Sequence, residues 1–326
     1  MRKLLWVVGT ACAAVIVIAG GYWFFGTGAL AAQPQLTGKL IRLTGTIKGL
    51  QRPYVLYIPQ GLKPGAPLLF MFHGSGGDGA STREVTGYGF DVLADRDKFL
   101  VVYPDGFETT WNDCRKASQQ PAHAMNIDDE SFIEAIIAQT AKNYGIDPKR
   151  VFAAGHSNGG QLAFRLALER PKEFAGIAAI SASIPTPENL SCTKSDIAIP
   201  AMVINGTADP INPFNGGMVT LGPFTKLGNV TSTRATVEYF AKIDGQTGQP
   251  VTTMLPHHDP RDPTSVERVS WEAPGKPPVV MYQVNKGGHV VPNPNYEYPD
   301  ILGRQTKDLD APVAIWDFFS KLPPRQ

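Results

Sequence analysis

A serine between two glycines stands at residues 155–159, which read Gly-His-Ser-Asn-Gly, the pattern G-x-S-x-G. The apolar run 151–154 precedes it, and residues 160–170 carry apolar side chains at helical spacing. A serine on a tight turn from a strand into a helix presents its hydroxyl above the edge of a sheet. We therefore predict that Ser157 is a nucleophile; the alternative is a purely structural turn.

A serine hydroxyl is a weak nucleophile and needs a base. In chains with this turn an acid and then a histidine follow the serine. Three histidines do so: His257, His258 and His289. His289 lies on a glycine-rich turn directly after the apolar run 279–284, so we predict that it is the general base. The other two fall in a proline-rich loop and read as solvated residues.

The predicted acid is Asp209, in the segment Gly-Thr-Ala-Asp-Pro at 206–210, just after the apolar run 201–204. Its carboxylate would accept the Nδ1 proton of His289 and fix the tautomer of the ring. The alternative is a structural Asp-Pro turn, and Asp259 is the second candidate for the acid.

An oxyanion formed during acyl transfer needs backbone donors in fixed positions. One should be the N–H of Asn158, next after the nucleophile. The other should come from the loop His-Gly-Ser-Gly-Gly at 73–77, which follows the apolar run 68–72. We expect Ser75 or its neighbour Gly74 to donate, and the loop histidine to order the loop. A structural glycine turn is the alternative.

Two aromatic residues are candidates for binding substrate, namely Trp111 and Phe214. Trp111 could instead be buried against a disulfide. Of three cysteines, Cys114 and Cys192 form an even pair in an exported chain, so we predict a disulfide between them. Two buried free thiols are the alternative.

The N-terminus reads as an export signal. Arg2 and Lys3 precede an uncharged apolar run, 4–25, and Ala-Leu-Ala follows at 29–31. The run is also long enough to span a bilayer uncleaved. We predict that residues 1–32 are a cleaved signal or an N-terminal anchor, and that the protein is secreted or periplasmic. Residues 33–326 would form one catalytic domain.

Short elements of alternating type must position these residues. Segments 40–47 and 54–58 alternate as half-buried antiparallel strands do, and the apolar runs at 68–72, 99–103, 151–154, 177–180, 201–204 and 279–284 suit buried parallel strands. Helical patterns lie at 131–144, 160–170, around Val237 and at 313–319. We predict an α/β fold: a mostly parallel central sheet, helices on both faces and antiparallel strands at the N-terminal edge. Residues 210–229 and 256–278 read as loops.

The composition excludes several functions. Thirty basic and 29 acidic side chains give a net charge of +1, and no basic tract is present, so we expect no nucleic-acid partner. The chain has neither a metal-ligand spacing nor a dinucleotide or phosphate motif, and we expect no metal and no cofactor. Membrane contact would come only from an uncleaved N-terminal segment.

These motifs resemble those of poly(3-hydroxybutyrate) depolymerase-like and feruloyl-esterase-like proteins of the α/β-hydrolase fold. The likeness covers residues 52–292 and rests on the three site segments, on Tyr-Pro-Asp-Gly at 103–106, Trp-Asn at 111–112 before Cys114, Ile-Asp-Pro-Lys-Arg-Val at 146–151 and Gly-Gly-His at 287–289. It implies an exported carboxylic-ester hydrolase with the triad named above, and it supports the disulfide. The chain departs from the family by lacking Trp-Pro after the histidine; Val290 and Val291 stand there before Pro292.

We therefore expect an exported serine esterase that acts through an acyl-enzyme on soluble or oligomeric esters, such as hydroxyalkanoate oligomers or feruloyl and acetyl esters. The same triad would also serve an acyltransferase or a serine peptidase. A noncatalytic binding protein is the alternative from another class.

Overall fold

The computed structural model describes residues 29–30, 33–222 and 224–325. Ten strands build one sheet: β2 (Lys39–Ile47), β3 (Leu50–Ile58), β4 (Leu68–Phe72), β5 (Leu100–Pro104), β6 (Val151–His156), β7 (Gly176–Ile180), β8 (Ala201–Gly206), β11 (Val251–Met254), β12 (Ser265–Trp271) and β13 (Val279–Asn285). Their order is β11-β12-β13-β8-β7-β6-β4-β5-β3-β2. The middle strands, from β13 to β5, are mutually parallel. Antiparallel pairs extend both edges.

The central strands are apolar on both faces because both faces are covered. In β4, Leu68 and Phe70 belong to one buried cluster, whereas Leu69 and Met71 belong to the other. Successive side chains of a strand point to opposite faces, so a continuous apolar run serves two cores.

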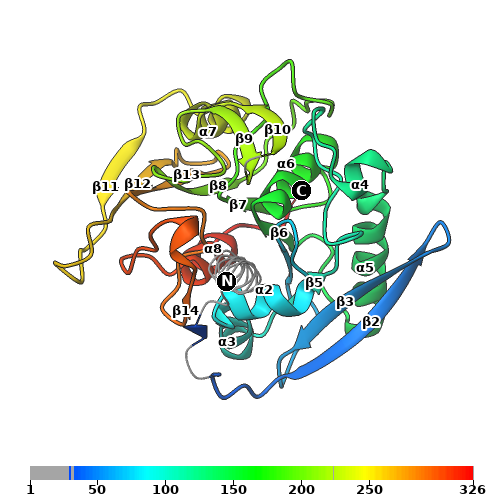
Figure 1. The fold of residues 1–326 in the computed structure, drawn as a ribbon. Coiled ribbons are helices and arrows are strands. Elements are labelled where there is room, and N and C mark those ends of the chain that lie inside the picture. Colours follow the sequence, from blue (N-terminus) through cyan, green and yellow to red (C-terminus); the bar gives the residue numbers. More distant parts are fainter. Residues whose placement is uncertain (1–28, 31–32, 223, 326) are drawn as a thin grey trace, which may run out of the picture.

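Helices supply the other half of each core. They are α2 (Gly79–Val85), α3 (Gly89–Asp97), α4 (Pro121–Ala124), α5 (Asp129–Tyr144), α6 (Asn158–Glu169), α7 (Thr233–Ile243) and α8 (Ala311–Ser320), with a 3-10 turn at Asp300–Leu302. Phe132 of α5 and Val237 of α7 join the cluster of Leu68, whereas Phe90 of α3 and Trp316 of α8 join that of Leu69. Figure 1 shows α2, α3 and α8 on one side of the sheet and α5, α6 and α7 on the other. The predicted layers are thus present.

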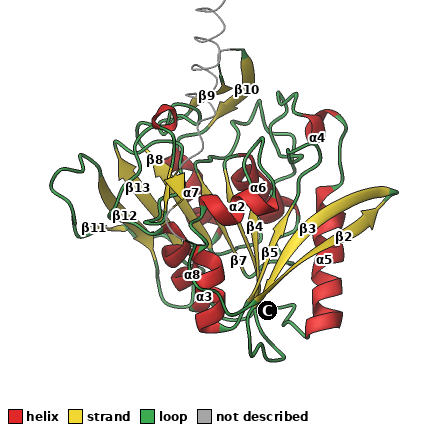
Figure 2. Cartoon of the chain, turned by 60° about the horizontal axis from the view of Figure 1, so that its bottom comes forward, coloured by secondary structure: helices red, strands yellow, loops and turns green. Residues whose placement is uncertain are grey.

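Two segments predicted as loops contain strands. Residues 210–229 contain β9 (Gly217–Leu221) and all but the last residue of β10 (Thr225–Val230), which together form a hairpin, and residues 256–278 contain β12. The hairpin is short, only partly buried and interrupted by glycine, so its apolar pattern is weak. Figure 2 shows it beyond the ends of the central strands. Helices α2, α3 and α4 and strand β11 are likewise absent from the predicted elements.

The N-terminal prediction falls outside the described residues, apart from β1 (Ala29–Leu30), which pairs with β14 (Tyr296–Glu297). No helix in the described part of the chain is long and apolar enough to cross a membrane.

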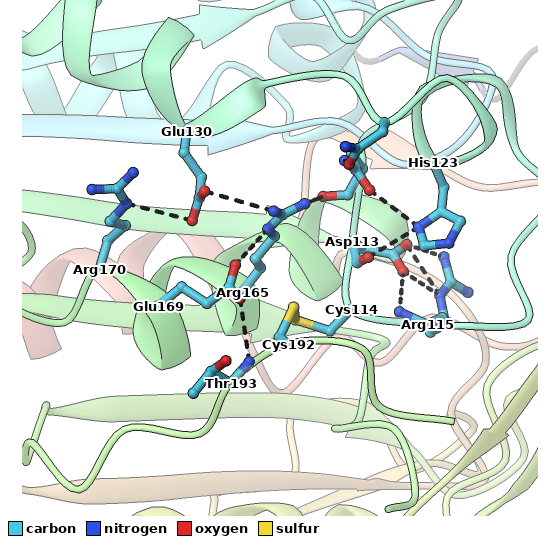
Figure 3. The surroundings of a disulfide bond; sticks show 12 residues. Asp113, Cys114, Arg115, His123, Glu130, Arg165, Glu169, Arg170, Cys192 and Thr193 are labelled. Carbon is cyan, nitrogen blue, oxygen red and sulfur yellow. Dashed lines mark hydrogen bonds and ion pairs between the residues drawn. A yellow bond between two sulfur atoms is a disulfide. The ribbon is translucent and has the colours of Figure 1, made fainter. Parts of the chain in front are cut away.

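The predicted disulfide is confirmed, since Cys114 and Cys192 are bonded across 78 positions of sequence. It joins the loop that follows β5 to the segment between β7 and β8 (Figure 3).

Candidate active site

Ser157 lies between the end of β6 and the start of α6, on the turn that the sequence predicts. Its backbone has φ 54° and ψ −116°, a strained combination for a residue with a side chain. The Ser157 N–H donates to the carbonyl of Ile180 at 2.8 Å, which ties the turn to β7. Strain at a serine on a strand–helix turn is the geometry of a nucleophile elbow.

The glycines around Ser157 are needed for close approach. A Cβ at Gly155 would lie 2.2 Å from the carbonyl oxygen of Gly159, and a Cβ at Gly159 would lie 2.4 Å from that of Phe72. Both distances are far inside van der Waals contact. The G-x-S-x-G spacing therefore lets the turn close and lets α6 start against β4.

His289 and Asp209 meet although 80 positions separate them in sequence. His289 Nδ1 and Asp209 Oδ2 are 2.8 Å apart, and both side chains are buried. The other oxygen, Asp209 Oδ1, accepts the N–H groups of Ile211 and Asn212, each at 2.8 Å. The carboxylate is thus held by three hydrogen-bond donors, which fixes both its own orientation and that of the imidazole.

Glycines bring these two turns together. A Cβ at Gly206 would lie 2.2 Å from the carbonyl oxygen of Gly287, so the ends of β8 and β13 touch through backbone alone. The Ala208 N–H donates to that same carbonyl at 2.9 Å, and the Lys286 N–H donates to Thr207 Oγ1 at 2.8 Å. The turn carrying the acid and the turn carrying the histidine are therefore one unit.

The predicted oxyanion donors come from two neighbouring strand ends. Ser75 follows β4 and Asn158 starts α6, and β4 pairs with β6. None of the hydrogen bonds among the described residues uses the backbone N–H of either one. A Cβ on Gly74 would lie 3.2 Å from the Cβ of Ser157, which places the loop directly against the serine.

His73 orders that loop. The Gly106 N–H donates to His73 Nε2 at 2.8 Å, so the ring proton is on Nδ1 and donates to the carbonyl of Gly74 at 2.7 Å. Burial lowers the pKa of His73, which keeps the ring neutral and this hydrogen-bond pattern intact.

His156 lies beside the candidate base. Its ring centroid is 5.0 Å from that of His289, and its Nε2 is buried without a partner. Burial first, and then the neighbouring His289, lower the pKa of His156 well below its ordinary value. A neutral ring at this position adds no positive charge next to His289.

A hollow of about 210 Å³ opens over these groups. Ser157, His289, Gly74 and Ser75 share its wall. The rest of the wall is largely apolar and includes Met71, Val85, Ile211, Leu221, Tyr298 and Leu302. Its volume is below the roughly 300–1,000 Å³ of pockets that enclose drug-sized ligands. The hollow suits one compact group of a substrate.

Within the described residues no hydrogen bond joins the Ser157 hydroxyl to His289. Catalytic hydrogen bonds are often long before substrate binds and tighten in the complex. The two side chains nevertheless line the same hollow.

The structure does not bring every candidate residue to the hollow. Trp111 is fully buried, donates through Nε1 to the carbonyl of His73 at 3.0 Å, and lies under the loop instead of in the hollow. Phe214 is half-buried and does not line the hollow. His257 is exposed and bonded to Asp308, and Asp259 pairs with Arg261.

Sequence reasoning missed two sets of residues. Val219 and Leu227 of the hairpin line a smaller hollow next to Ser157, as does Arg115. Arg115 forms a buried ion pair with Asp113. The available signal is that two opposite charges flank Cys114, a residue predicted to form a disulfide. Within the described ranges no group of three or more His, Cys, Asp or Glu side chains could hold a metal ion.

The chain is similar in sequence to known esterases. The sequence profile of the phospholipase/carboxylesterase family matches residues 56–246. NocK of Nocardia uniformis, a protein named as an esterase, is 29% identical over 84% of this chain and 80% of its own length. Feruloyl esterase C of Emericella nidulans is 29% identical over 59% of this chain and 65% of its own length, slightly below two thirds.

Among solved structures, an acetyl xylan esterase from Aspergillus awamori superposes with a TM-score of 0.57. The alignment covers 87% of this chain and 99% of that one, at 16% sequence identity. At that identity the likeness concerns the fold alone.

Proposed function

Because this chain belongs to the phospholipase/carboxylesterase family, we propose that it is an exported esterase that forms an acyl-enzyme on Ser157. Membership of the family makes it an ester hydrolase of the α/β-hydrolase fold. The nucleophile, the mechanism, the substrates and the export are the parts that we add.

In the proposed first step, Ser157 Oγ attacks the ester carbonyl carbon while His289 Nε2 takes the hydroxyl proton. Asp209 accepts the Nδ1 proton in a hydrogen bond and stabilises the imidazolium that forms. The oxyanion accepts hydrogen bonds from the backbone N–H groups of Asn158 and Ser75. The intermediate then collapses, and the alcohol leaves with the proton from His289.

In the second step, water gives a proton to His289 and attacks the acyl carbon. Collapse of this intermediate breaks the bond to Ser157 Oγ, which takes the proton back, and the acid is released. The observation that best supports the proposal is that Ser157 and His289 line one hollow while His289 Nδ1 is 2.8 Å from Asp209 Oδ2.

The proposed substrates are soluble or oligomeric esters of a compact acyl group. A hollow of about 210 Å³ would hold one such group, and the remainder of an oligomer would lie outside it. The names of feruloyl esterase C and the acetyl xylan esterase make feruloyl and acetyl esters the first to test. Hydroxyalkanoate oligomers remain a further prediction from the sequence.

The test is hydrolysis of short-chain nitrophenyl esters by the purified protein beside Ser157→Ala. Loss of a triad nucleophile lowers kcat by up to about 10⁶-fold. We expect an active parent, a Ser157→Ala variant that is inactive but has the parent's melting temperature, and then a preference within a screen of feruloyl, acetyl-sugar and hydroxybutyrate-oligomer esters. Activity that persists in Ser157→Ala would refute the proposed nucleophile.

A further inference from the structure

The loop at residues 111–120, between β5 and α4, contacts both proposed oxyanion elements. Building on the proposed function, we propose that the Asp113–Arg115 ion pair and Gln120 of this loop are positioning residues, which hold the N–H groups of Asn158 and Ser75 in one fixed arrangement. Nothing in the mechanism above requires these three side chains to touch the substrate.

The chain of contacts begins at Asn158. Its Oδ1 accepts the Trp111 N–H at 2.7 Å, and its Nδ2 donates to Asp113 Oδ2 at 2.6 Å and to the Trp111 carbonyl at 3.2 Å. The side chain is buried and every polar atom of the amide is engaged. Asn158 therefore cannot rotate without breaking three hydrogen bonds, and its backbone N–H is fixed with it.

The chain continues through the ion pair. Arg115 Nη2 donates to Asp113 Oδ2 at 2.5 Å, Arg115 Nε donates to both carboxylate oxygens at 3.1 Å, and the Arg115 N–H donates to Oδ1 at 2.8 Å. The two side chains are 3% and 0% exposed, so the pair is almost fully desolvated. Figure 3 shows it beside the Cys114–Cys192 disulfide, which ties the loop to the segment between β7 and β8.

The chain ends at Ser75. Arg115 Nη2 donates to Gln120 Oε1 at 3.3 Å, and Gln120 Nε2 donates to Ser75 Oγ in a short hydrogen bond. One run of side-chain hydrogen bonds therefore leads from the residue after the nucleophile to the loop after β4. The two proposed donors come from different strand ends, and this run links their side chains.

Such a network contributes by holding the N–H groups of the oxyanion hole in a fixed orientation. A buried ion pair is often no more stabilising than apolar residues of the same volume, so stability alone does not explain it. Donors of an oxyanion hole act through fixed orientation, and a displacement of about 1 Å can cost about 100-fold in rate. A network that keeps two N–H groups in place should therefore affect kcat more than KM.

Gln120 is the residue to change, because removing Arg115 would leave the Asp113 carboxylate buried without its partner. In Gln120→Met both links are lost at similar volume, and in Gln120→Glu a carboxylate can accept from both Arg115 and the Ser75 hydroxyl. Ser75→Ala removes the anchor but keeps the backbone N–H. We expect Gln120→Met and Ser75→Ala each to lower kcat about tenfold on nitrophenyl esters with KM within about twofold.

Two further results are expected. Gln120→Glu should recover most of the lost kcat, and the double variant Gln120→Met/Ser75→Ala should fall no lower than the poorer single variant, because both break the same link. Gln139→Met is the matched control. Gln139 is half-buried on α5 and accepts from the Tyr54 hydroxyl, away from the hollow, so its loss should leave kcat unchanged.

Parent-like kcat in Gln120→Met, or multiplicative losses in the double variant, would overturn this inference alone, provided that Ser157→Ala is inactive. A change in KM without a change in kcat would do the same. A folded parent that hydrolyses no ester would overturn the proposed function and this inference with it. Melting temperatures of all variants show that a loss of kcat is not a loss of folded protein.

Discussion

Asp244 directly follows α7, and its ionised carboxylate destabilises the folded state. The side chain is buried; Oδ1 accepts the Ile199 N–H at 3.1 Å, and Oδ2 has no partner. Burial raises the pKa of Asp244 to about 8. Between its ordinary pKa and pH 8 the folded state therefore keeps a proton that the unfolded state has released. The free energy of unfolding therefore falls as pH rises through this window, by up to about 1.4 kcal/mol per pH unit.

Asp244→Asn should remove this penalty because an amide stays neutral at every pH. We expect the variant to gain melting temperature over the parent from pH 5 upward, with the gain levelling off above pH 8 at several degrees. The measurement is thermal unfolding by circular dichroism at pH 5, 7 and 9. Asp317→Asn, on the exposed side of α8, is the control. A gain that is the same at all three pH values would contradict the assigned pKa.

At this scale the sequence predicts residues whose chemistry constrains their position. Ser157, Asp209 and His289 could be selected because each follows an apolar run and because chain order restricts the choice. The structure brings Asp209 and His289 into contact, as predicted. Trp111 is buried in the structure. The sequence left both a pocket wall and the core open for it, because a large aromatic ring with one polar atom suits either place. Gln120 could not be selected, since its role depends on the path of the whole loop.

The 111–120 loop and its disulfide form the element on which the stability prediction rests. Besides the bond between Cys114 and Cys192, the Cys114 carbonyl accepts the Ser191 N–H at 3.0 Å and the Lys116 N–H donates to the Asn189 carbonyl at 2.7 Å. A crosslink that closes a loop of about 80 residues lowers the entropy of the unfolded chain and so raises the free energy of unfolding by roughly 4 kcal/mol.

Replacing both cysteines, in Cys114→Ser/Cys192→Ser, should lower the melting temperature by roughly 10 °C. Scanning calorimetry checks this, and reduction of the parent should give the same loss. Thr252→Ser, at an exposed position of β11, is the control and should have no effect. An unchanged melting temperature in the double variant would mean that hydrogen bonds to residues 189–191 hold the loop without the crosslink.

Which elements the sequence predicts depends on how strongly packing patterns them. The buried strand β4 reads clearly because all five side chains are covered. Helix α2 reads Gly-Ala-Ser-Thr-Arg-Glu-Val, with no apolar stripe, and is instead started by an Asp78–Ser81 capping box. The hairpin β9–β10 has one buried residue in β9, Val219, so its alternation is too short to detect.

At the scale of the whole molecule, the order of the strands in the sheet could not be predicted from the sequence. Apolar runs predict that parallel strands exist, but not that β8 lies between β13 and β7 or that β4 lies between β6 and β5. The parallel direction of β6, β8 and β13 puts the serine, acid and histidine turns at one edge of the sheet, and the strand order decides how near to one another they lie. The rule that serine, acid and histidine follow one another in the chain selects the same three residues, because in this fold their turns follow strands in that order.

The predicted export leader is the last feature of the whole molecule, and its processing decides what lies beside the hollow. Ala29–Leu30 pairs with Tyr296–Glu297, and the next residue, Tyr298, lines the hollow with Ser157. Cleavage after the Ala-Leu-Ala segment at 29–31 would remove this strand, whereas an uncleaved anchor would keep it. We predict cleavage, because positive residues, an apolar run and small residues occur in that order.

Amino-terminal sequencing of the exported protein tests this directly, and we expect a start near Gln33. Ala31→Asp, which places a charge where a small residue is required, should keep the protein membrane-bound and unprocessed. Gln35→Asp, a charge placed beyond the expected cleavage point, is the matched control and should be processed as the parent is. A parent that starts at Met1 and sediments with membranes would show an anchored esterase, with β1 retained next to its active-site hollow.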